Sequence, residues 1–182
     1  MNGFMDREFL LDTQTAQKLF HEYAENMPIC DYHCHLSPKE IYENEQPADI
    51  SQLWLSGDHY KWRAMRSCGI DEKYCTGDAS PKEKFVKFAE ALQYCIGNPL
   101  YHWAHIELQR YFGIHTPLNA KTAEDIYEKA NAAMANGDFR PQSLITKSNV
   151  KVVCTTDDPM DSLEYHKLLK NVEGFDCKVL PT

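Results

Sequence analysis

Val150-Lys151-Val152-Val153-Cys154-Thr155-Thr156 is the clearest strand in this chain of 182 residues, because it is rich in β-branched side chains. Directly after it, Asp158-Pro159-Met160-Asp161 offers a helix N-cap and a proline at the first helical position, so a helix is predicted from there to about Asn171. The apolar stretch from Phe175 to Leu180 then predicts another strand. Strands that alternate with helices usually pair in parallel, so this part of the sequence indicates an α/β architecture.

Toward the N-terminus, Met27-Pro28-Ile29-Cys30-Asp31-Tyr32-His33 has the pattern of a short buried strand. A helix is predicted before it, between Asp12 and Asn26, where apolar residues recur at helical spacing. A short helix is predicted after it, with Ser37 as N-cap and Pro38 at the first helical position. The predicted order is therefore strand, long helical segment, strand, helix, strand.

The long segment from Ile50 to Asn136 is predicted to be almost wholly helical. Ser80-Pro81-Lys82-Glu83 is a capping box that begins one helix, and Gly97, Gly113 and Gly137 mark predicted helix ends. We expect the large aromatic side chains of this segment to pack in the core. Because the insertion far exceeds the roughly 2–6 residues of an ordinary βα loop, we expect it to form a lid or a wall of an active site.

Composition excludes several classes of protein. The chain has 19 basic and 27 acidic side chains, a net charge of −8, and no Lys/Arg cluster, which disfavours binding to nucleic acids or anionic membranes. It has no apolar run near the ~20 residues that span a bilayer, and no signal peptide is indicated. None of the seven cysteines forms a CxxC pair and most lie in apolar contexts, so we expect reduced, mostly buried thiols in a cytoplasmic protein.

The sharpest chemical motif is Asp31-Tyr32-His33-Cys34-His35, at the end of the first predicted strand. Side chains at i and i+2 of a strand share a face, so His33 and His35 are expected to project together, with Asp31 below them. Two imidazoles spaced in this way can bind one divalent ion such as zinc. The alternative is that the pair is simply two polar residues, since HxH also recurs by chance.

A second cluster, Ser56-Gly57-Asp58-His59-Tyr60-Lys61-Trp62-Arg63, combines an acid, an imidazole, a phenol and cations beside a glycine. These groups are suited to proton transfer and to binding an anionic substrate. The alternative is a solvated helix start in which Trp62 packs inward and the charges face water.

A third cluster, Thr155-Thr156-Asp157-Asp158-Pro159, lies on the same edge as the HxH pair if the strands are parallel. Asp158 is expected to be a helix cap, and the role of Asp157 stays open. Among the other histidines, His102 and His105 are expected to pack or to lie on the surface, and no partner is expected for His21, His115 or His166.

Together these segments resemble the uronate isomerases (glucuronate isomerases), a branch of the amidohydrolase superfamily, over essentially the whole chain. The HxH pair is generic to the superfamily, whereas its combination with the second cluster is specific to the branch. The segments that carry the resemblance are Phe9-Leu10-Leu11, Asp31 to Leu36, Asp58 to Arg66, Trp103 to Leu108, Thr155 to Pro159 and Val179 to Thr182.

The resemblance implies a (β/α)8 TIM barrel that interconverts aldose and ketose uronates, D-glucuronate with D-fructuronate and D-galacturonate with D-tagaturonate. It implies His33 and His35 as zinc ligands. It also implies His59 and Tyr60 as catalytic residues that contact a small uronate sugar, with Arg63 as a further substrate-binding residue.

The resemblance further implies that residues 1–182 are the N-terminal segment of a single barrel domain, with residues 50–136 inserted after the first strand. The family's aspartate and arginines from later strands would then lie outside this chain, and we expect the chain alone to be inactive. An open barrel edge would be covered by the missing strands or by another copy of the chain in a homo-oligomer. Two rival interpretations are a metal-dependent hydrolase of the same superfamily and a non-catalytic helical interaction module.

Overall fold

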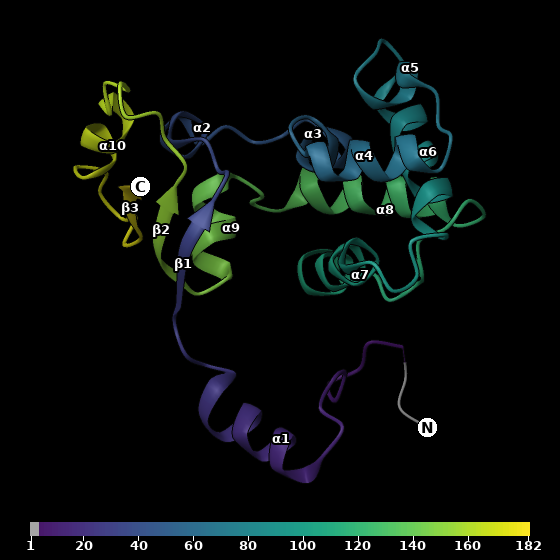
Figure 1. The fold of residues 1–182 in the computed structure, drawn as a ribbon, viewed down its shortest axis with the longest axis horizontal. Coiled ribbons are helices and arrows are strands. Elements are labelled where there is room, and N and C mark those ends of the chain that lie inside the picture. The colour runs from purple at the N-terminus through teal and green to yellow at the C-terminus, as the bar shows by residue number, and fades with distance from the viewer. Residues whose placement is uncertain (1–3) are drawn as a thin grey trace. The chain divides into compact units, whose positions relative to one another are not determined.

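The chain forms two compact units in the computed structural model, which describes residues 4–182 (Figure 1). One unit is helical and contains residues 47–137 together with residues 4–7. The other contains residues 8–46 and 138–182 and carries the sheet. The chain therefore leaves the sheet unit after its first strand and returns to it before the second.

The sheet has three parallel strands in the order β1-β2-β3, namely β1 (Ile29–Cys34), β2 (Val150–Thr155) and β3 (Lys178–Pro181). Cys34 pairs with Thr155, and Thr155 pairs with Pro181, so the carboxyl ends of the three strands are level. The parallel α/β arrangement that the sequence indicated is confirmed. The polar residues that follow β1 and β2 consequently emerge at one edge of the sheet.

Helices pack on this sheet through a small apolar core. The helices of the unit are α1 (Gln14–Leu19) with its π-helical extension η1 (Phe20–Ala24), α2 (Pro38–Glu43), α9 (Pro141–Lys147) and α10 (Glu164–Leu169). The core consists of Ile41, Ile145, Leu169, Phe175 and Val179, drawn from three helices, a loop and β3. By their contacts α9 packs on β2 and α10 on β3, and Figure 1 shows α10 next to β3.

The helix expected to have Asp158 as its N-cap begins five residues later, with Leu163 at the N-cap position and Glu164 as its first residue. The Asp158 carboxylate instead accepts a hydrogen bond from the Met160 backbone N–H at 2.8 Å, and Asp161 accepts one from the Asp158 N–H at 3.0 Å. Aspartates that bond neighbouring backbone groups in this way favour a turn over a helix. The third strand is also shorter than expected, because Phe175 packs into the apolar core before β3 begins.

The first predicted helix is present, but its apolar face is not covered by the described residues. Thr13 caps it by accepting a hydrogen bond from the Ala16 N–H at 3.1 Å. Neither α1 nor η1 has a buried residue, and Leu19 and Tyr23 are exposed. The helical spacing of apolar residues thus predicted this helix correctly. Its apolar side chains, however, are not buried by other residues of the described range 4–182.

The other unit consists of α3 (Ile50–Leu55), α4 (His59–Ser67), α5 (Glu72–Cys75), α6 (Pro81–Leu92), α7 (Pro99–Phe112) and α8 (Ala123–Asn136). The capping box at the start of α6 forms as predicted, with Ser80 and Glu83 each accepting from the other's backbone N–H. Gly113 ends α7 in the left-handed conformation at φ 66°, which glycine adopts without strain. Phe85, Phe88, Leu108 and Ile126 form a fully buried centre.

Two expectations about burial hold only in part, although Trp54, Phe85 and Phe88 are buried as expected. Several aromatic side chains of the helical unit are exposed, including Trp103 at 55% and Tyr94 at 76%. Of the seven free cysteines only Cys75 is buried, and Cys30 and Cys68 are exposed. Among the residues that the structure describes, no helix is both long and apolar enough to cross a membrane.

Candidate active site

His33 and His35 lie side by side at the carboxyl end of β1. Their ring centroids are 5.2 Å apart and the rings are nearly perpendicular, at 89°. Between Asp31 and Cys34 the pairing with β2 is irregular, because three steps along β1 oppose two along β2. Such a bulge interrupts the alternation of side chains between the two faces of the strand, on which the expected shared face of Asp31, His33 and His35 depended. It also changes the direction of the side chains that follow it.

These two imidazoles fit part of a zinc site. Imidazole nitrogen is a preferred zinc donor, and a catalytic zinc usually has three protein ligands and one open position. Within the described part of the chain, no group of three or more His, Cys, Asp or Glu side chains has metal-binding geometry. His33 and His35 therefore suit two coordination positions, and further ligands are needed to complete the shell.

A buried polar network lies at the neighbouring end of β2. The Thr155 hydroxyl contacts Asp157 Oδ2 and His166 Nε2, each at 2.7 Å. The hydroxyl also lies 3.2 Å from the Leu180 carbonyl oxygen. Because the carboxylate and this carbonyl only accept, the single hydroxyl hydrogen goes to one of them, and His166 Nε2–H donates to the Thr155 oxygen. Thr155 is fully buried, and His166 of α10 is 5% exposed. The network fixes Asp157 against α10.

No local pattern in the sequence predicts this network, and two histidines expected to have no partner do have one. His166 is buried with the partners just described, and His21 lies 3.2 Å from Glu8 and 3.1 Å from Glu25. The signal that was available for His166 is its spacing of three residues from the buried Leu169, which places both on one face of α10.

In the helical unit, Asp58 begins α4 and positions the second cluster. Its carboxylate accepts backbone hydrogen bonds from Tyr60 and Lys61 at 3.0 and 3.1 Å, and pairs with Lys61 Nζ at 2.5 Å. Burial alone would raise the pKa of Asp58, but the hydrogen bonds and charge of Lys61 outweigh it and hold the pKa below its usual value. The cap orients the first turn of α4, from which His59, Tyr60 and Arg63 project.

His59, Tyr60 and Arg63 form a stack. The rings of His59 and Tyr60 have centroids 4.3 Å apart, and the Arg63 guanidinium lies 5.4 Å from the centre of the Tyr60 ring. Tyr60 is half exposed. An imidazole, a phenol and a guanidinium are thus presented together on one turn of helix, a set that can bind a carboxylate and exchange protons with hydroxyl groups.

Lys61, a member of the same cluster, lies on the opposite, buried face of α4. Lys61 is 9% exposed, and its Nζ lies 5.8 Å from the centre of the Trp54 ring. Burial raises the pKa of Glu107, against the opposing influence of Lys61 and of a hydrogen bond from Trp54. The buried Lys61 contradicts the alternative of a fully solvated helix start. Through Trp54 and Glu107, Lys61 also links the first turn of α4 to α3 and α7.

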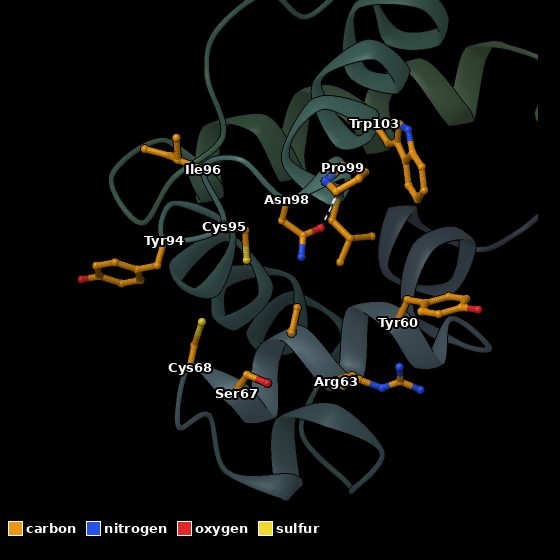
Figure 2. Close-up of a pocket in the computed structure, with 12 residues that line it drawn as sticks. Tyr60, Arg63, Ser67, Cys68, Tyr94, Cys95, Ile96, Asn98, Pro99 and Trp103 are labelled. Atoms are coloured by element: carbon orange, nitrogen blue, oxygen red, sulfur yellow. Dashed lines mark hydrogen bonds between the residues drawn. The ribbon is translucent and has the colours of Figure 1, made fainter.

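A cavity of about 730 Å³ adjoins this stack. Figure 2 shows Tyr60 and Arg63 of α4 near Trp103 of α7, with Cys68 and Cys95 at the far side of the cavity. The full lining is Tyr60, Arg63, Ala64, Ser67, Cys68, Tyr94, Cys95, Ile96, Asn98, Pro99, Leu100 and Trp103. The cavity thus combines a cation with exposed aromatic rings, which suits a small polar anion with an apolar face.

The structure therefore groups the predicted site residues in two sets. His33 and His35 come together in the sheet unit, and His59, Tyr60 and Arg63 come together in the helical unit.

Comparison with known proteins places these residues in a family. The glucuronate isomerase family profile matches residues 1–182. The chain is 60% identical over 181 residues to the uronate isomerase of Caldanaerobacter subterraneus subsp. tengcongensis, covering 100% of this chain and 39% of the relative. It is 56% identical over 181 residues to the uronate isomerase of Bacillus subtilis, covering 100% of this chain and 38% of that relative.

Solved structures agree. The crystal structure of uronate isomerase from Thermotoga maritima superimposes with a TM-score of 0.91 at 38% identity, covering 100% of this chain and 39% of that one. Glucuronate isomerase from Caulobacter crescentus matches with a TM-score of 0.83 at 28% identity, covering 100% and 40% respectively. The chain thus spans about 39% of the length of the curated relatives it matches. The family profile covers every residue of the sequence, and the chain belongs to the glucuronate isomerase family.

Proposed function

We propose that this chain forms part of an isomerase that interconverts aldose and ketose uronates, D-glucuronate with D-fructuronate and D-galacturonate with D-tagaturonate. The observation that carries the proposal is the family match across the whole chain, supported by relatives named uronate isomerase at 54–60% identity. The stack of His59, Tyr60 and Arg63 beside a cavity supports it independently, because its chemistry suits a sugar acid.

We further propose that β1, β2 and β3 belong to a (β/α)8 barrel, with residues 50–136 inserted between its first two strands. Three parallel strands with level carboxyl ends support this, since active-site groups of such barrels gather at that end. In the described residues β1 and β3 are both edges of the sheet. We infer that further strands of the barrel, or a second copy of the chain, cover these edges.

The reaction moves a proton between C2 and C1 while the adjacent carbonyl is polarised, so it needs a proton carrier and positive charge near the oxygens. In this proposal Arg63 holds the substrate carboxylate through paired N–H donors. The Tyr60 hydroxyl donates a hydrogen bond to a sugar oxygen. His59, stacked on Tyr60, exchanges a proton with a substrate hydroxyl as the sugar ring opens.

His33 and His35 would hold a divalent metal ion, zinc by the preference of imidazole, with other groups completing its shell. Such an ion, when bound, supplies positive charge to substrate oxygens. The contribution of this chain is to hold two nitrogen donors next to one another at the carboxyl end of β1.

The test is an assay of the complete gene product with D-glucuronate and D-galacturonate, with the ketose products followed by NMR. We expect both sugars to be isomerised and Tyr60→Phe to lower kcat/KM by at least about ten-fold, which corresponds to ~1.4 kcal/mol of lost transition-state stabilisation. Tyr74→Phe is the matched control, because Tyr74 belongs to α5, does not line the cavity and packs against Lys73 and Lys87.

Two outcomes would overturn the proposal. Absence of ketose product from a folded, zinc-loaded protein would contradict the isomerase function. Hydrolysis of amide or ester substrates that is unaffected by Tyr60→Phe would favour the metal-dependent hydrolase instead, because that chemistry has no need of the stack on α4.

A further inference from the structure

We propose that Cys68 and Cys95 form a dithiol modification site, which a low-molecular-weight disulfide oxidises to an intramolecular disulfide bond. The two residues are 27 positions apart and belong to no CxxC motif, so only the fold brings them together. The inference concerns thiol chemistry and is independent of the proposed isomerase activity.

The two thiols converge on one backbone carbonyl. The Cys68 and Cys95 Sγ atoms each donate to the Ala91 carbonyl oxygen, at 3.7 and 3.5 Å. Figure 2 shows the sulfurs turned toward one another at the cavity wall. A disulfide needs two side chains that point toward each other, which the shared contact with Ala91 and the facing sulfurs provide.

The backbone on either side can make the remaining adjustment. Cys68 is the C-cap of α4 and Cys95 lies in the turn after α6, so neither is held inside a helix. Gly69 follows Cys68 with φ 76°, and Gly97 lies two residues after Cys95 with φ 87°. Nothing lies within 4 Å of the Cβ position of either glycine, which leaves room for a small shift of each turn.

The exposure of the two thiols determines which of them reacts first with the oxidant and which reacts second. Cys68 is exposed and Cys95 is partly buried, and burial together with the neighbouring Cys68 raises the pKa of Cys95. Cys68 is therefore the thiol that meets the oxidant, and Cys95 is the resolving thiol. Because the thiolate is the nucleophile, both steps accelerate as pH rises.

The chemistry balances with a disulfide RSSR such as oxidised glutathione as the oxidant. The Cys68 thiolate attacks one sulfur of RSSR, forming Cys68–S–S–R and releasing one thiolate, which takes up a proton as RSH. The Cys95 thiolate then attacks Cys68 Sγ, forming the Cys68–Cys95 bond and releasing the second RSH. Two protein thiols are oxidised and one disulfide is reduced to two thiols.

The other cysteines provide a contrast. Cys30 is also exposed, but it lies on β1, in the other unit. Cys75 is buried on α5, and burial raises the pKa of its thiol. We therefore expect Cys30 to form at most a mixed disulfide with glutathione and Cys75 to remain reduced.

The experiment treats the complete gene product with oxidised glutathione under native conditions, blocks the remaining thiols, and maps peptides without reduction. The expected product is a cross-linked pair of peptides that contain Cys68 and Cys95, without bound glutathione. In Cys68→Ser and in Cys95→Ser the cross-link is expected to vanish, and the remaining partner should be able to retain one glutathione. Cys30→Ser is the matched control and should keep the cross-link.

A second experiment tests the same proposal on the wild-type protein, without any substitution. Phenylarsine oxide binds two neighbouring thiols through one arsenic atom, so wild-type protein pretreated with it should not form the cross-link. A dithiol that removes the arsenic should restore the cross-link once the dithiol has been washed out and fresh oxidised glutathione has been added. The proposal is overturned if native protein gives no Cys68–Cys95 cross-link, if the cross-link forms only in urea, or if phenylarsine oxide fails to block it.

Discussion

At the residue scale, Asp58 combines the roles of helix cap and counter-ion to the buried Lys61. Its pKa is lowered in the folded state, so its ionised form stabilises the fold. That stabilisation is present above the unfolded-state pKa of about 4 and is lost as the pH falls through the lower folded-state value.

We expect Asp58→Asn to keep the cap but leave Lys61 without its counter-ion, at a cost of about 1–3 kcal/mol at pH 7. Asp58→Ala should cost about 1 kcal/mol more, because it also removes the cap. Urea unfolding at a series of pH values checks this, and the decline of stability below pH 4 should be shallower in both variants than in the wild type. An equally steep decline would show that Asp58 is not the titrating group.

Thr155 offers a second test at this scale, because its hydroxyl is the link between Asp157 and His166. Thr155→Val preserves shape but leaves two buried polar groups without that link, and we expect a loss of about 1–3 kcal/mol in unfolding free energy. Thr155→Ser retains the hydroxyl and should recover most of the hydrogen-bonding contribution. Equal losses in the two variants would mean that the methyl group, and not the hydrogen bonds, is responsible.

At the scale of elements, the sequence predicted a helix start correctly where the capping residues are neighbours in the sequence. Ser80 and Glu83 begin α6 by a reciprocal pair of hydrogen bonds that needs no distant residue. The start of α10 shows the opposite case. Its Asp-Pro pair resembled a cap, but Asp158 bonds within its own turn, and α10 starts after Leu163, which has φ 54°.

We expect Ser80→Ala to lower the unfolding free energy by about 1 kcal/mol, the usual contribution of an N-cap, since it removes the oxygen that accepts from the Glu83 N–H. Ser80→Asp should retain the stability, because aspartate is an equally good cap and favours the helix N-terminus. Thermal unfolding followed by circular dichroism distinguishes the two. A destabilised aspartate variant would assign the effect to the serine hydroxyl that donates to Glu83.

At the scale of the whole molecule, the proposed function assigns this chain only part of a catalytic centre. In that proposal His33 and His35 would hold two positions of a zinc shell that usually has three protein ligands, and Arg63 is the one residue proposed to hold the carboxylate. A polypeptide of residues 1–182 is therefore expected to bind zinc weakly and to show no isomerase activity.

Parallel assays of that polypeptide and of the complete gene product with D-glucuronate, with bound zinc measured in both, test this expectation. Positioning contributes up to ~7–11 kcal/mol to catalysis, so loss of metal and carboxylate anchors should reduce turnover below detection. Comparable turnover in the two proteins would contradict the assignment of the site.

The sequence by itself determined the order of the strands and of the long helical segment between them, the starts of α1, α2 and α6, and the proximity of His33 to His35. These depend on interactions over a few residues: periodicity, capping and the polar residues that end a strand. Tertiary structure alone decided the bulge in β1, the network of Thr155 with Asp157 and His166, and the convergence of Cys68 with Cys95. These contacts join residues that no local pattern links, so their geometry exists only once distant segments have packed together.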